Sequence, residues 1–168
     1  IFNYMSFFKE QELQFIERTK SLLEQYDKLE VVPNQEEKYE VTLLLNCCVG
    51  LLILPQSKWH VRIPQEEISS VQWGIDPSKI SICKSKSLVD EPKNLQNVTR
   101  HLRNSIAHHN FTILKNENEE IGSIEFKDFP PRNKSTKTFE LTIEIKPLKK
   151  FLLKFSEEMI RIMEAAKR

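Results

Sequence analysis

Apolar residues recur every three or four positions over the first third of the chain, a period typical of amphipathic helices. The pattern predicts a first helix over Ser6–Leu29 and a second over Gln35–Leu54. Val31–Asn34, which contains a proline, is expected to separate them. The second half of the second helix is apolar almost all round, so we expect a central buried helix in which Gly50 permits a close helix–helix approach.

The stretch Asn94–Asn110 is predicted to form a helix with two different faces. Its apolar residues fall on one side, which should face the core: Leu95, Val98, Leu102 and Ile106. Arg100, Asn104 and His108 recur at every fourth position on the opposite side, and Arg103 flanks this stripe. The helix therefore gathers several side chains of the kinds that carry catalysis.

The period changes to two after this helix, which predicts β-strands. Apolar and polar residues alternate over Phe111–Lys115, Gly122–Phe129 and Thr136–Ile145. Pro147 then stands in the first turn of a last helix with an apolar face. The predicted fold class is mainly α, an antiparallel helical bundle with a small three-stranded antiparallel sheet, at about 111–145, inserted before the last helix.

Length and composition favour one globular domain over 1–168. The chain has 168 residues, of which 39% are hydrophobic and 29% charged, which is enough for a core and unlike a disordered protein. Its longest apolar run, Val41–Leu54, is too short to span a membrane. The three cysteines make no disulfide framework, so we expect buried thiols and a cytoplasmic location.

The formal net charge is only +1, so any nucleic-acid site must be a local basic patch. A Ser-rich run carries Lys79, Lys84 and Lys86, which fit either a loop that contacts a phosphate backbone or an ordinary solvated loop. The edge of the predicted sheet carries Lys134 and Lys137, which suit either edge protection or contact with RNA. The sequence has no Gly-rich phosphate loop, nucleophile elbow or dinucleotide fingerprint, and we expect no cofactor.

The run Arg103–His108 resembles the motif of the HEPN superfamily, in which an arginine and a polar residue precede a histidine by a short gap. Phe15–Thr19 and Glu40–Asn46, with the following Gly50–Gln56, also resemble the helices that precede the motif in one HEPN branch. The resemblance covers most of the chain and is weakest over Glu66–Glu91.

This resemblance implies a HEPN-type helical bundle and, as the expected function, a metal-independent RNA endonuclease of a toxin–antitoxin or defence system. Arg103 and His108 would be catalytic and Asn104 would support them. Histidine suits proton transfer near neutral pH, and arginine offers a charged fork to phosphate. The resemblance also implies a homodimer with facing motif helices, products with a 2′,3′-cyclic phosphate and a 5′-hydroxyl, and RNA and an antitoxin or regulatory protein as partners.

Four further residues are candidates for an auxiliary role at the site: His109, Arg100, Asn46 and Arg18. Each has a structural alternative. His109 fits a helix cap or a packing residue, Arg18 a salt-bridged surface side chain, and Asn46 a buried amide bonded to a neighbouring backbone. His108 itself fits a helix-end histidine stabilised by the helix dipole.

A zinc site formed by His101, His108 and His109 is disfavoured, because no HExxH or paired-cysteine spacing accompanies it; His101 is expected to face solvent. Two other functions stay open. One is a non-catalytic HEPN-like module that binds RNA, a nucleotide or a protein. The other is a helical interaction protein without any nucleic-acid role, which the near-neutral charge favours.

Overall fold

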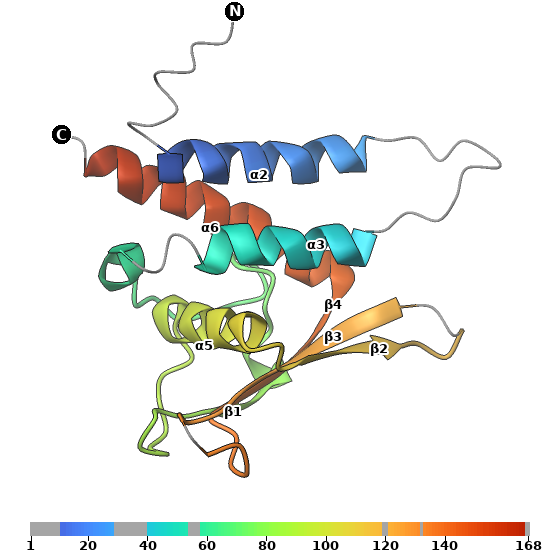
Figure 1. The fold of residues 1–168 in the computed structure, drawn as a ribbon, viewed down its shortest axis with the longest axis vertical. Coiled ribbons are helices and arrows are strands. Elements are labelled where there is room, and N and C mark those ends of the chain that lie inside the picture. The colour runs from blue at the N-terminus through green and yellow to red at the C-terminus, as the bar shows by residue number, and fades with distance from the viewer. Residues whose placement is uncertain (1–10, 29–39, 54–57, 119–120, 132, 167–168) are drawn as a thin grey trace, which may run out of the picture.

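Helix α5 (Leu95–Ala107) lies between a layer of helices and a β-sheet (Figure 1). On one side lie α2 (Gln11–Asp27), α3 (Glu40–Cys48) and α6 (Ile145–Ala165), with α2 packed along α6. The computed structural model describes residues 11–28, 40–53, 58–118, 121–131 and 133–166. In this part of the chain, no helix combines the length and the apolar character that a membrane span needs.

Helices α2 and α3 occupy the central parts of the first two predicted helices. The predicted ends at Ser6, Leu29, Gln35 and Leu54, and the break at 31–34, lie outside the described residues. After α3 the chain continues as a π-helical segment, η1 (Val49–Ile53). Gly50 in this segment is buried against α2, where an added Cβ would lie 2.5 Å from Phe15 Cε1. The close approach predicted for this glycine is therefore confirmed.

The sheet has four antiparallel strands in the order β1-β4-β3-β2. They are β1 (Ile80–Cys83), β2 (Phe111–Lys115), β3 (Ile121–Asp128) and β4 (Phe139–Glu144). The long pairing is between β3 and β4, where Phe126 lies opposite Leu141. The side chains that these two strands turn toward the helices are fully or almost fully buried: Ile124, Phe126, Phe139, Leu141 and Ile143.

The predicted fold class was wrong. The sheet is not an insertion at 111–145 before the last helix, because β1 comes from before α5 and pairs with β4. Its buried face belongs to the main core, so helices and sheet together make the fold, not a bundle with an appendage. The prediction missed β1 because four residues, Ile-Ser-Ile-Cys, are too short for a reliable period.

A tight turn ahead of β1 is held against α6. Lys150 Nζ donates hydrogen bonds to the backbone oxygens of Ser70 (3.0 Å) and Val71 (2.8 Å). Gly74 closes the turn with a φ of 78°, a left-handed conformation that favours glycine. A Cβ at this position would also lie 2.9 Å from the backbone oxygen of Pro147. Both the dihedral angle and the space therefore require glycine here.

We expect Gly74→Ala to lower the free energy of unfolding by about 1–3 kcal/mol, because alanine would be strained at this φ and would press on α6. Urea denaturation followed by circular dichroism measures this. Ser70→Ala, at an exposed position of the same turn, is the control and should change stability by less than about 0.5 kcal/mol. Equal stability of Gly74→Ala and the wild type would contradict the role assigned to this turn.

Candidate functional site

Helix α5 has the two faces that its sequence predicts. Asn94 caps its first turn, because the side-chain oxygen accepts a hydrogen bond from the backbone nitrogen of Asn97 at 2.8 Å. The apolar side is buried against the helical layer and the core, and comprises Leu95, Val98, Leu102 and Ile106. The helix is thus held with its polar side turned away from the core.

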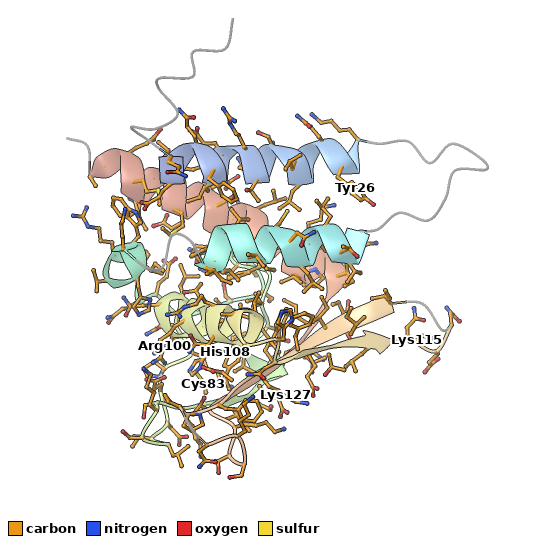
Figure 2. All side chains as sticks on the ribbon, viewed as in Figure 1. Tyr26, Cys83, Arg100, His108, Lys115 and Lys127 are labelled. Carbon is orange, nitrogen blue, oxygen red and sulfur yellow. The ribbon has the colours of Figure 1, made fainter. Side chains whose placement is uncertain are left out.

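This polar side forms one wall of a pocket of about 630 Å³. Arg103, Asn104 and His108 all line it, as does Arg100. Figure 2 labels Arg100 and His108 beside α5, with His108 as the residue that follows the helix. Lys86, from the loop after β1, and Lys134, from the segment between β3 and β4, line the same pocket. The structure therefore brings the predicted motif residues and four cationic side chains to one opening.

The end of α5 sets the position of His108. The helix ends at Ala107, His108 is its C-cap, and His109 has a left-handed φ of 53°. The backbone nitrogen of His109 donates to Ile106 O (3.2 Å) and that of Asn110 to Ser105 O (2.8 Å), the two bonds of a Schellman motif. His108 therefore lines the pocket, while the exposed His109 turns beside Phe111 and does not line it.

A buried pair joins α5 to the sheet next to this pocket. His101 is 2% exposed, and its Nδ1 lies 2.8 Å from Oδ2 of Asp128 at the end of β3. The same oxygen accepts a hydrogen bond from Asn104 Nδ2 at 2.9 Å. The flat face of the His101 ring stacks on the Phe139 ring, with 4.8 Å between ring centroids. Two motif-helix side chains are thus fixed by one carboxylate.

The pKa of Asp128 is held below its ordinary value. Burial by itself would raise this pKa, because it disfavours the charged carboxylate. Hydrogen bonds from His101 and Asn104, the nearby His101 ring and the backbone nitrogen of Phe129 together outweigh the burial. Asp128 is therefore an ionised group at neutral pH, and it anchors the wall of the pocket.

The two arginines of the helix differ in what surrounds them. The Arg100 guanidinium forms an ion pair with the carboxylate of Glu91, and its Nη2 lies 3.1 Å from His101 Nε2. Arg103 forms no ion pair with the described residues, and its Nε is buried without a hydrogen-bond partner among them. Of the two arginines, Arg103 is therefore the one whose charge is left for an anion in the pocket.

His60, from the short 3₁₀ segment His60–Arg62, flanks the helix on the arginine side. Gln96 Nε2 donates a hydrogen bond to its backbone oxygen at 3.0 Å. The pKa of His60 is lowered by burial and by the positive charges of Arg100 and Arg103. This histidine is therefore neutral beside the two guanidinium groups and adds no charge to them.

A family model described as HEPN pEK499 p136 matches the chain over residues 5–165. The chain belongs to this HEPN family. No curated protein and no solved structure matches it. The match confirms that the chain is a member of the HEPN superfamily, and the matched residues include both α5 and the sheet. This protein is therefore a HEPN-type domain.

Two of the auxiliary candidates of this HEPN domain lie away from the pocket. Arg18 is exposed on α2, and Asn46 is exposed on α3; neither lines the pocket. The expectation that Asn46 would be buried was wrong, because α3 turns Leu44, Cys47 and Cys48 toward the core instead.

The expectation that His101 would face solvent was also wrong, and its two acidic neighbours were not foreseen. His101 is covered by the sheet, which a helical wheel cannot show. Asp128 did carry a signal, because it follows Ile124 and Phe126 at alternate positions on the buried side of a strand, where a carboxylate needs partners. Glu91 precedes α5 in a loop and has no comparable signal.

We expect His109→Gly to raise the free energy of unfolding by about 1 kcal/mol, because glycine adopts the left-handed C′ conformation without the steric cost of a side chain. Urea denaturation of the variant beside His109→Ala measures the effect. The alanine variant keeps that steric cost and should gain nothing. A glycine variant that is less stable than the wild type would show that contacts of the His109 ring matter more than its backbone.

Asp128→Asn should lower the free energy of unfolding by about 1–3 kcal/mol at neutral pH, because His101 and Asn104 lose a charged buried acceptor. The change is measured by thermal and urea unfolding. Asp90→Asn removes an exposed carboxylate just before Glu91 and is the matched control, for which little change is expected. An Asp128 effect no larger than that of Asp90 would argue against a pair that joins helix and sheet.

Proposed function

We propose that this HEPN domain, acting as one unit over 1–168, is a metal-independent RNA endonuclease. The observation that carries the proposal is that Arg103, Asn104 and His108 line one pocket. His108 is exposed there, and Arg103 has no carboxylate partner among the described residues. An imidazole and an uncompensated guanidinium that line one pocket suit a phosphodiester that reacts by proton transfer.

In the proposed reaction the ribose 2′-oxygen attacks the adjacent phosphorus. The 2′-hydroxyl loses its proton, the O2′–P bond forms, the P–O5′ bond breaks, and the leaving 5′-oxygen gains a proton. Arg103 stabilises the charge on the phosphate oxygens, and His108 transfers a proton. Asn104 supports these two residues. Its amide nitrogen donates a hydrogen bond to Asp128, which holds this wall of the pocket in place. The products carry a 2′,3′-cyclic phosphate and a 5′-hydroxyl.

The charges around the pocket support RNA as the substrate. The whole chain has a net charge of only +1, yet Lys86, Arg100, Arg103 and Lys134 all line this pocket. The one carboxylate among the lining residues, Asp128, is already engaged by His101 and Asn104. A local excess of cationic side chains is what a phosphate backbone requires.

The reaction needs both a base and an acid, and one copy of the pocket offers a single exposed imidazole. His101 also lines the pocket, but it is buried and bonded to Asp128. We therefore place a second His108 opposite the first, in a homodimer whose two α5 helices face each other. A toxin or defence role in the cytoplasm, controlled by an antitoxin or another regulatory protein, fits an RNase of this family.

A second candidate is a HEPN module that binds RNA without cleaving it. It is favoured because one copy of the pocket has a single exposed imidazole, whereas cleavage needs both an acid and a base. In that case the cationic pocket would hold the phosphate backbone, and His108 would contribute a contact and no proton transfer. Binding would weaken steeply with salt, because the phosphate contacts release counterions. Retention of RNA without any cleavage would distinguish this candidate from the nuclease.

The test is incubation of purified protein with mixed-sequence RNA in excess EDTA. We expect cleavage, with fragments whose new 5′-hydroxyl accepts phosphate from polynucleotide kinase without prior phosphatase treatment. His108→Ala should lower the rate by about 10²–10⁴ and Arg103→Ala by about 10²–10³, because each removes a group that acts in the transition state. Arg103→Lys keeps the charge but not the fork, so partial activity is expected.

Arg161→Ala is the matched arginine control, because Arg161 is exposed on α6 and pairs with Glu158. His109→Ala is the histidine comparison and shows which of the two neighbouring imidazoles acts. Each variant is checked by circular dichroism and by its elution volume on gel filtration. Equal cleavage by the wild type and by His108→Ala, with folding intact, would refute the proposed mechanism.

A further inference from the structure

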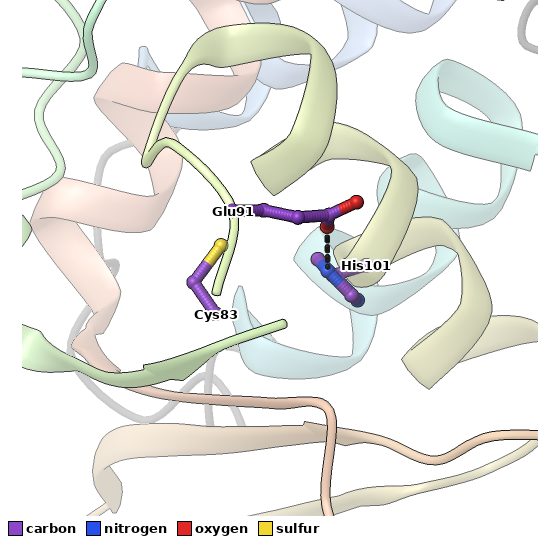
Figure 3. Close-up of side chains that lie close together, drawn as sticks. All are labelled: Cys83, Glu91 and His101. Carbon is purple, nitrogen blue, oxygen red and sulfur yellow. Dashed lines mark hydrogen bonds and ion pairs between the residues drawn. The ribbon is translucent and has the colours of Figure 1, made fainter. Parts of the chain in front are cut away.

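Three side chains from separate parts of the chain meet behind the pocket. Cys83 ends β1, Glu91 lies in the loop before α5, and His101 is on α5 (Figure 3). Their thiol, carboxylate and imidazole ligand atoms all lie within 4.8 Å of one another. Cys83 and His101 are buried, and Glu91 is half-buried. Small adjustments would bring the three atoms to the mutual distances found around a tetrahedral ion.

Asp128 prepares the His101 ring for such a role. In the tautomer whose Nδ1–H donates to Asp128, at 2.8 Å, the lone pair of the ring is on Nε2. That atom lies 3.3 Å from Glu91 Oε2, on the side of the cluster (Figure 3). A carboxylate behind the imidazole is the usual way in which proteins orient a metal-binding histidine.

Arg100 supplies the positive charge of this cluster. Its guanidinium pairs with Glu91 and lies 3.1 Å from His101 Nε2, the atom that would bind a metal ion. A divalent ion that displaced Arg100 and the thiol proton of Cys83 would leave the charge of the cluster unchanged. The ion brings two positive charges, and the Arg100 guanidinium and the thiol proton of Cys83 each take one away. The exchange therefore adds no uncompensated charge to the buried site.

We propose that Cys83, Glu91 and His101 bind a divalent ion of the zinc class in exchange for the Arg100 guanidinium. On binding, the Cys83 S–H bond breaks, its proton goes to solvent, and sulfur, carboxylate oxygen and imidazole Nε2 each donate a lone pair to the ion. Water takes the fourth position. The thiolate and imidazole select zinc or a similar ion over Mg²⁺ and Ca²⁺, which prefer oxygen ligands.

Metal binding would change the neighbouring pocket, because Arg100 also lines it. Once released from Glu91, this guanidinium adds an unpaired positive charge beside Arg103. The ion is therefore a regulator of the pocket and takes no part in the proposed RNA chemistry. This inference goes beyond the proposed function, and its test uses no RNA, so either can fail without the other.

The test is a titration of the purified full chain with Co²⁺, which replaces zinc and is visible spectroscopically. We expect a near-ultraviolet thiolate-to-cobalt charge-transfer band, visible bands typical of tetrahedral geometry, saturation at one ion per chain, and loss of all bands on addition of Zn²⁺. Cys83→Ser should abolish the charge-transfer band. Cys47→Ser, which changes another buried thiol, should retain it.

Two variants test the mechanism without removing a ligand. Arg100→Gln should bind Co²⁺ more tightly than the wild type, because the competing cation is gone. Asp128→Asn should bind it about 10–100-fold more weakly, because the imidazole loses the carboxylate that orients it. His108→Ala should leave Co²⁺ binding unchanged. This variant distinguishes the proposed site from a zinc site formed by His101, His108 and His109.

The wild-type spectrum alone decides the outcome if Cys83→Ser fails to fold. Absence of a thiolate band in the wild type at saturating Co²⁺ overturns the proposal. A band that persists in folded Cys83→Ser, or one that disappears in Cys47→Ser, places the ion elsewhere and overturns it too. Unchanged affinity in Arg100→Gln overturns the exchange of the guanidinium for the ion.

Discussion

The structure of this domain depends on the hydrogen bond between His101 on α5 and Asp128 at the end of β3. Both groups are buried, and a buried polar group without a partner is costly. The pair therefore fixes how the helix lies on the sheet, while Asn104 and the stacked ring of Phe139 limit its rotation. His101 and Asn104 are both held by this attachment.

The same attachment explains how a nearly neutral chain carries a cationic pocket. Asp128 is committed to His101 and Asn104, and Glu91 is committed to Arg100, so the carboxylates nearest the pocket are already matched. Arg103 is left without one among the described residues. At the end of the helix, the left-handed turn at His109 stops α5 while His108 still faces the opening. Charge placement and helix termination together define the pocket, and overall charge does not.

Prediction from sequence succeeded where the signal is local. The apolar side of α5, the strands after it and the last helix each repeat a short period over many residues, and all are found in the structure. The predicted stripe of Arg100, Asn104 and His108, with Arg103 flanking it, lines one pocket for the same reason. Prediction failed for β1, whose four residues become a strand only by pairing with the distant β4. The fold class was wrong because this one strand makes the sheet a part of the core.

The sequence by itself determined the faces of the helices, the alternation of the later strands and the spacing of Arg103, Asn104 and His108, because these follow from the order of neighbouring residues. Only the tertiary structure decided which polar side chains are buried. His101 became a core residue, and Asn46 a surface one, through the elements packed against them. It also brought Cys83 and Glu91 to His101, because burial and ligand geometry depend on contacts between residues far apart in the chain.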